Sequence, residues 1–154
     1  MGTGDRDDHG PMPVDVEQML RLWTEPLPGD DAAAAASFRE LYSDPVTVNG
    51  TPVTAFDLVA RARMMQGALE QPEREVLAVV DGGVSVAVAF RLAGRHVGPL
   101  ETSAGRLPPT GQRIDLRIID ILSLTDGRVS AIWMVADWLA ALVAVDAVQF
   151  PGNE

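Results

Sequence analysis

Asp137 is the residue of this chain whose type and position most strongly indicate chemistry. It ends the apolar run Val129–Asp137 and directly precedes the equally apolar run Trp138–Val145. If the first run is a strand, its side chains alternate between faces, so Trp133, Val135 and Asp137 share one side. A carboxyl group in such surroundings loses hydration, which disfavours its ionised form. Its residue type and position fit two roles equally, proton transfer as an acid/base and capping of the helix that follows.

Two charged residues on the preceding strand could support Asp137. Asp120 shares its face if a tight two-residue turn joins the two strands, and a second buried carboxyl would raise one of the two pKa values. The alternative role of Asp120 is a hydrogen bond to the backbone or to the Trp133 ring. The same turn places Leu116 opposite Asp137, whereas one bulge would place Arg117 there. The simpler interpretation of Arg117 is an exposed position on a solvated face.

His96 is a third candidate for a supporting role. It is one of two histidines and lies beside glycines in a long segment between strands, where it could act at a pocket rim or bond to the backbone. His9 belongs to the polar N-terminal segment and is set aside. A metal site needs three or four converging ligands, and two distant histidines without cysteine do not indicate one.

Bulky apolar side chains could line a pocket for a hydrophobic ligand. Core packing is the ordinary role of such residues, so the assignment depends on their neighbours. The candidates are Trp133 and Val135 beside Asp137, and Phe90, Met65 and Trp23 elsewhere in the chain.

The elements that must position these residues change in type along the chain. Residues 1–13 are predicted to be a disordered tail, and residues 14–150 a single domain. Helical spacing comes first, over Val14–Trp23, Ala32–Leu41 and Phe56–Leu69. Period-two alternation follows, over Arg74–Val80, Val84–Ala93, Arg113–Leu124 and Arg128–Asp137, with a closing helix over Trp138–Val148. This order predicts an α+β fold in which a curved antiparallel sheet wraps around N-terminal helices and leaves a ligand cavity between them.

Composition excludes several classes of partner. The formal net charge of −10 over 154 residues opposes binding to nucleic acid or to an anionic membrane, because both need a cationic surface. No apolar run reaches the roughly 20 residues that cross a bilayer. The chain has no cysteine and its N-terminal segment is polar and acidic, so we expect a cytoplasmic protein without disulfides.

Several short motifs resemble those of SnoaL-like polyketide cyclases, also called ester cyclases. The similarity extends over about residues 38–143. The motifs occur in the family's order and spacing, at Leu41–Pro45, Gly94–Gly98, Pro108–Gly111, Ile119–Arg128 and Ile132–Asp137.

The resemblance implies the cone-shaped fold of the nuclear transport factor 2 superfamily and a cyclase that needs no metal or cofactor. It implies acid/base catalysis of an intramolecular aldol ring closure on a polyketide-like carbonyl compound in antibiotic biosynthesis, with Asp137 as the acid/base by motif position. It also implies homo-oligomers that pair through the outer face of the sheet. The chain departs from the family pattern at Arg95, Ser123 and Ala131–Ile132, where polar family residues are replaced.

Two alternative functions remain open. Epoxide opening needs an Asp–Arg–Asp set, which Asp115, Arg117 and Asp137 supply only if a bulge turns them inward. A non-catalytic binding domain for small molecules is the other alternative, and the loss of polar residues at Ser123 and Ala131–Ile132 favours it.

Overall fold

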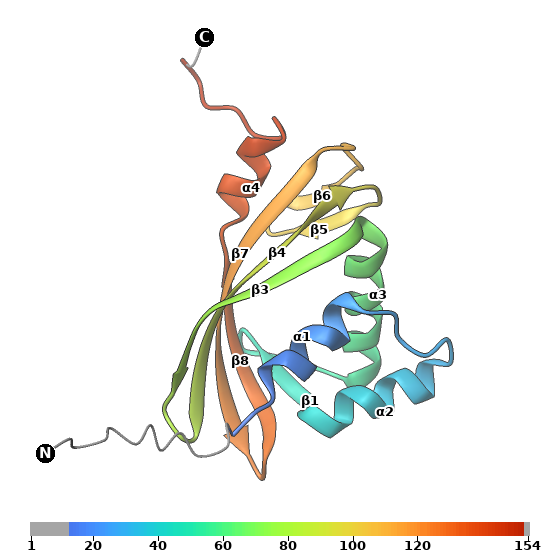
Figure 1. Ribbon diagram of the computed structural model, residues 1–154, viewed down its shortest axis with the longest axis vertical. Coiled ribbons are helices and arrows are strands. Elements are labelled where there is room, and N and C mark those ends of the chain that lie inside the picture. The colour runs from blue at the N-terminus through green and yellow to red at the C-terminus, as the bar shows by residue number, and fades with distance from the viewer. Residues whose placement is uncertain (1–12, 153–154) are drawn as a thin grey trace, which may run out of the picture.

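Three helices lie on one side of a curved, six-stranded sheet (Figure 1). The structure is a computed structural model that describes residues 13–152, so the predicted tail and His9 lie, except for Pro13, outside the described residues. The helices are α1 (Val16–Thr24), α2 (Asp31–Leu41) and α3 (Ala55–Ala68), and a short α4 (Trp138–Ala144) follows the last strand. None of the described helices is both long and apolar enough to cross a bilayer. The predicted α+β fold is confirmed.

The helices begin where the sequence provides caps. Asp15 accepts a hydrogen bond from the backbone at the start of α1, and Asp30 does so at the start of α2. Thr54 and Asp57 form a reciprocal capping box at the start of α3. Each of these helices therefore starts within two residues of its predicted position.

The sheet is mixed rather than purely antiparallel. Its order is β2-β1-β8-β7-β4-β3, and β1 pairs with β8 in parallel while every other neighbouring pair is antiparallel. Most of the chain separates β1 from β8, so no hairpin fixes their relative direction. A separate two-stranded sheet pairs β5 with β6. The strands are β1 (Tyr42–Val48), β2 (Thr51–Val53), β3 (Leu69–Asp81), β4 (Ser85–His96), β5 (Leu100–Thr102), β6 (Gly105–Leu107), β7 (Arg113–Thr125) and β8 (Arg128–Ala136).

A bulge at Ser130 sets the register of β7 against β8. The pairing passes from Leu124–Val129 to Ser123–Ala131 and skips Ser130. Asp120 consequently lies opposite Met134 rather than opposite Trp133, which the register of a tight two-residue turn would place there.

The bulge also decides which residue lies opposite the end of β8. The backbone N–H of Asp137 donates to the carbonyl oxygen of Arg117 over 2.9 Å. The bulged alternative is thereby confirmed, and the tight-turn register, with Leu116 at this position, is wrong.

Candidate active site

A cavity of about 460 Å³ lies between the concave face of the sheet and the helices. Its walls are mostly apolar, and they come from α1, α3, β1, β4, β5, β7, β8 and the start of α4. Phe90, Met65 and Trp23, three of the predicted pocket residues, lie on these walls. The other main contributors are Met19, Leu20, Leu58, Met64, Leu92, Ile118, Ile132 and Trp138.

Asp120 is the buried carboxyl group on the cavity wall. The strand β7 alternates regularly, with Ile114, Leu116, Ile118 and Leu122 buried on the inner face, and Asp120 occupies an inner position in the same phase. Only 7% of the residue is exposed. The oxygen Oδ1 is fully enclosed and has no hydrogen-bond partner among the described residues. An unpartnered buried polar group costs about 1–3 kcal/mol, so this position is unfavourable for stability alone.

Burial shifts the ionisation of Asp120 towards neutrality. Removal from water raises its pKa from 3.8 to about 7, because the ionised form loses hydration that nothing in the cavity replaces. The carboxyl is therefore present as both base and acid near neutral pH. This is the property that a group needs if it removes a proton and later returns it.

A second polar pair faces the same cavity. The indole Nε1–H of Trp23 on α1 donates to the Tyr42 hydroxyl on β1 over 3.1 Å. Both residues line the cavity, and Tyr42 is 2% exposed. Burial raises the pKa of Tyr42, which remains a neutral phenol.

Apart from Asp120, the charged side chains that line the cavity are exposed and lie at its rim. Arg61 on α3 and Glu101 on β5 both line the cavity and are exposed. Glu101 pairs with Arg106 over 2.6 Å, whereas no acidic partner of Arg61 is found within residues 13–152. The site thus combines an apolar interior, one enclosed carboxyl, one phenol and a charged entrance.

The comparisons agree with this architecture. A model of the SnoaL-like polyketide cyclase family matches residues 17–145, which include every element around the cavity. The chain belongs to the SnoaL-like polyketide cyclase family. Its fold is accordingly the cone-shaped fold of the nuclear transport factor 2 superfamily, and the family supports a cyclase type of function.

Solved structures of other bacterial proteins share the fold. TsrD from Streptomyces laurentii is 21% identical, with a TM-score of 0.72 over 86% of this chain and 92% of its own. A proposed SnoaL-like polyketide cyclase from Jannaschia sp. CCS1 is 26% identical, with a TM-score of 0.65 over 87% and 92%. IdmH, a proposed polyketide cyclase from Streptomyces antibioticus, is 19% identical, with a TM-score of 0.59 over 86% and 98%. No curated protein matches the chain.

In this SnoaL-like chain Asp137 does not line the cavity. Its side chain is exposed and accepts a hydrogen bond from the Ala140 backbone over 3.1 Å as the cap of α4. Trp133 and Val135 share its face, as expected, but that is the outer face of the sheet, where they are 58% and 73% exposed. The expected pocket position of all three residues is therefore wrong. The apolar outer face misled the prediction, because hydrophobic alternation alone does not identify which face is the inner one.

Arg117 also lies on the outer face and is exposed. The stripe Arg113, Asp115 and Arg117 is solvated, as the simpler interpretation predicted. Asp115 is paired with Arg91 over 2.8 Å. The Asp–Arg–Asp set that epoxide opening would require is thus not brought into the cavity.

His96 is fully buried, but it does not line the cavity. Its Nδ1 accepts a hydrogen bond from the Thr110 backbone over 3.1 Å, and its own carbonyl oxygen accepts one from Gly111 over 2.9 Å. These bonds join the two motifs Gly94–Gly98 and Pro108–Gly111. His96 therefore has a structural role here, in which it holds the end of β4 against the residues that precede β7.

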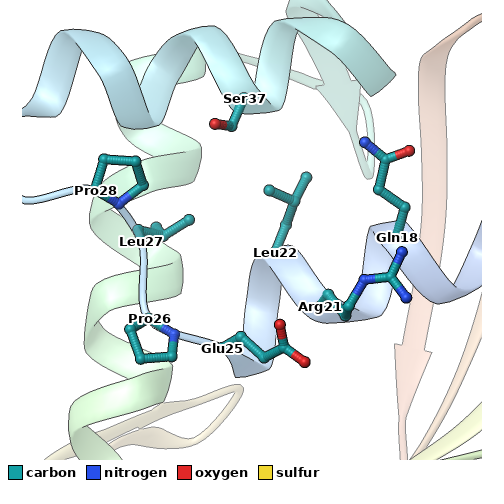
Figure 2. A pocket seen from close by; sticks show the side chains of 8 residues that line it. All are labelled: Gln18, Arg21, Leu22, Glu25, Pro26, Leu27, Pro28 and Ser37. Atoms are coloured by element: carbon teal, nitrogen blue, oxygen red, sulfur yellow. The ribbon is translucent and has the colours of Figure 1, made fainter.

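Two other features lack the chemistry of a site. A smaller pocket of about 210 Å³ lies between α1, α2 and the linker that joins them, but its charged residues, Arg21 and Glu25, are exposed (Figure 2). Residues 13–152 contain no group of three or more His, Cys, Asp or Glu side chains that could hold a metal ion. Sequence reasoning missed Tyr42, although it belongs to the motif Leu41–Pro45, and it also missed the rim residue Arg61, because only the tertiary structure shows which side chains of β1 and α3 meet the cavity.

Proposed function

We propose that this protein is a cofactor-independent cyclase or isomerase that acts by acid/base catalysis on a hydrophobic, polyketide-like carbonyl compound. The carboxyl of Asp120 is the acid/base. One observation carries the proposal, namely an enclosed carboxyl without a partner in an otherwise apolar cavity. Family membership supports the class of reaction, and the apolar walls support a hydrophobic substrate.

The proposed reaction begins with removal of a proton. The Asp120 carboxylate takes a proton from the carbon next to a substrate carbonyl, and the C–H electron pair becomes the C=C bond of an enolate. In ring closure the enolate carbon attacks a second carbonyl of the same molecule, which forms a C–C bond and an alkoxide. The alkoxide then takes the proton back from the Asp120 carboxylic acid. The sequence is redox-neutral, and a pKa near 7 suits both proton transfers.

We further propose that two copies of the chain pair through the outer face of the sheet. Ile121 lies directly opposite Trp133, and Ile119 directly opposite Val135, so the four side chains form one patch across β7 and β8. All four are exposed, between 46% and 73%. Contiguous exposed apolar surface of this kind marks interaction sites in soluble proteins. A second copy presents the same patch and is therefore a complementary partner.

The acid/base role is tested with a ketone probe. We expect the wild type to catalyse hydrogen–deuterium exchange at the α-carbons of 2-tetralone in D₂O, followed by proton NMR, with a rate that rises with pH through about 7. Asp120→Asn should lower the exchange rate by about 10²- to 10⁴-fold, because the amide cannot accept the proton.

Asp137→Asn is the matched control. Asparagine caps a helix as well as aspartate does, so this variant keeps α4 and should exchange at the wild-type rate. If Asp137→Asn loses exchange while Asp120→Asn remains active, the acid/base residue is Asp137 and not Asp120. A wild type that binds 2-tetralone without exchanging it would instead favour a non-catalytic binding domain.

A further inference from the structure

Tyr42 is held rigidly at the wall of the cavity. It is the single tyrosine of the chain and the first residue of β1. Its ring packs on Phe38, with ring centroids 5.9 Å apart, and Phe38 in turn contacts Trp23 edge to face at 5.6 Å. Phe38 is fully buried. The hydroxyl of Tyr42 is consequently fixed by packing before any ligand enters.

The hydrogen-bonding capacity of Tyr42 is only half used. An indole N–H is a donor and never an acceptor, so in the bond with Trp23 the phenol oxygen accepts. The phenol O–H itself has no acceptor within residues 13–152. Burial is the main cause that raises the pKa of Tyr42, and the charge of Asp120 raises it further, so the O–H proton is retained. Tyr42 is therefore a donor without an acceptor.

Asp120 is the reverse case in the same cavity. Its Oδ1 is an acceptor without a donor, although both side chains line the same space and the phenol does not bond to the carboxyl. Buried polar groups are normally paired, so two unpaired groups of opposite kind indicate a ligand that pairs with both. Such a ligand offers an oxygen acceptor to the phenol and a proton to the carboxyl. A carbonyl compound with an acidic α C–H has this combination.

We propose that Tyr42 is a second catalytic residue, whose O–H donates a hydrogen bond to the substrate carbonyl oxygen and to the enolate oxygen that forms when Asp120 removes the α-proton. Trp23 is a positioning residue that orients the phenol. This inference rests on the proposed function. No proton leaves Tyr42 in the step, because the negative charge that develops on the oxygen is stabilised by the hydrogen bond alone. The substrate class is narrowed to ketones and related carbonyl compounds that enter with the carbonyl oxygen towards Tyr42.

The first test measures binding and needs no turnover. Because Tyr42 is the only tyrosine, fluorotyrosine incorporated in place of tyrosine gives one ¹⁹F NMR signal from the site. We expect 2-naphthol to shift that signal and naphthalene, which lacks the oxygen, to shift it less. Tyr42→Phe should weaken 2-naphthol binding by about 10- to 100-fold and leave naphthalene binding unchanged. Trp23→Phe should weaken 2-naphthol binding by about 2- to 10-fold.

The second test measures catalysis of the exchange reaction with 2-tetralone. Tyr42→Phe should slow turnover at saturating ketone by about 10²- to 10³-fold with a much smaller change in KM, because the donor acts mainly on the enolate. If Tyr42→Phe exchanges at the wild-type rate while Asp120→Asn is inactive, this inference is overturned and the proposed function stands. If the wild type does not exchange 2-tetralone at all, the proposed function fails. The binding test is then decisive for Tyr42, because equal losses of 2-naphthol and naphthalene affinity in Tyr42→Phe would overturn its role as a hydrogen-bond donor.

Discussion

At the scale of residues, two aspartates with similar sequence surroundings have opposite environments. Asp120 lies between isoleucines and Asp137 follows a run of apolar residues, so both sequences suggest a desolvated carboxyl. Asp120 is buried at the wall of the cavity, whereas Asp137 is exposed and its carboxylate accepts a hydrogen bond from the first turn of α4. The difference arises from the strand face, which local composition does not reveal.

The buried carboxyl makes the stability of the protein depend on pH. The folded-state pKa of Asp120 is raised from 3.8 to about 7, so the folded state holds a proton that the unfolded state has released between these values. The resulting penalty is absent below the lower value, grows as pH rises, and reaches about 4 kcal/mol above the higher one. Asp120→Asn removes this penalty.

We therefore expect the wild type to lose about 2–3 kcal/mol of unfolding free energy relative to Asp120→Asn between about pH 5 and about pH 8. Urea denaturation of both proteins at the two pH values measures the difference. Asp137→Asn, which alters an exposed carboxyl, should follow the wild type. A difference between wild type and Asp120→Asn that does not change with pH would contradict the buried ionisation.

At the scale of elements, the segment after β4 caps the C-terminal end of α3. The backbone N–H groups of Val97 and Gly98 both donate to the Ala68 carbonyl oxygen, over 2.9 Å and 3.2 Å. A Cβ atom added to Gly98 would lie 2.3 Å from the carbonyl oxygen of Gly67. Only glycine allows the two backbones to approach this closely, so the packing against α3 requires a glycine at position 98 of the Gly94–Gly98 motif.

Two glycine substitutions on either side of this contact should have opposite effects. Gly98→Ala should lower the free energy of unfolding by about 1–3 kcal/mol, because the new methyl group overlaps the backbone. Gly67→Ala should raise it by about 0.5–1 kcal/mol, because Gly67 lies within α3 and has open space around its Cα. Denaturant midpoints compare the two variants, and equal effects would show that the contact is not rigid.

At the scale of the whole molecule, the sheet has two apolar faces with different partners. The inner face packs on the helices and lines the cavity, while the outer face carries the exposed patch of Ile119, Ile121, Trp133 and Val135. The proposed pairing of two copies would cover this patch and leave the cavity accessible from its rim.

A matched pair of valines tests the pairing. Val135 is 73% exposed within the patch, and Val84 is 75% exposed at the turn between β3 and β4. Val135→Lys should convert the dimer to a monomer in light-scattering measurements after size-exclusion chromatography, because a charge would be buried in the interface. Val84→Lys should remain dimeric. A wild type that is monomeric at every concentration would exclude this interface.

The sequence alone was sufficient for the order of the main helices and long strands and for the family. Caps such as Asp15 and Asp30 and the alternating strands depend on neighbours a few residues away, so the order of helices and strands was predictable. The apolar cavity between helices and sheet followed from the same pattern, and three of its wall residues were identified.

Only the tertiary structure decided which residues meet in the cavity. The single extra residue Ser130 decides which residues lie opposite Asp120 and opposite Arg117 in the neighbouring strand. Because the outer face of the sheet is also apolar, the sequence around Asp137 resembled that of an inner residue. Tyr42 and Trp23 are 19 positions apart and belong to a strand and a helix, so no local sequence pattern could predict their hydrogen bond. The sequence determined that helices precede long alternating strands and that an apolar cavity lies between them, because periodicity is local, and the family resemblance added the cone-shaped fold. The choice of Asp120 depended on register and on the assignment of faces, which are set by contacts between distant segments.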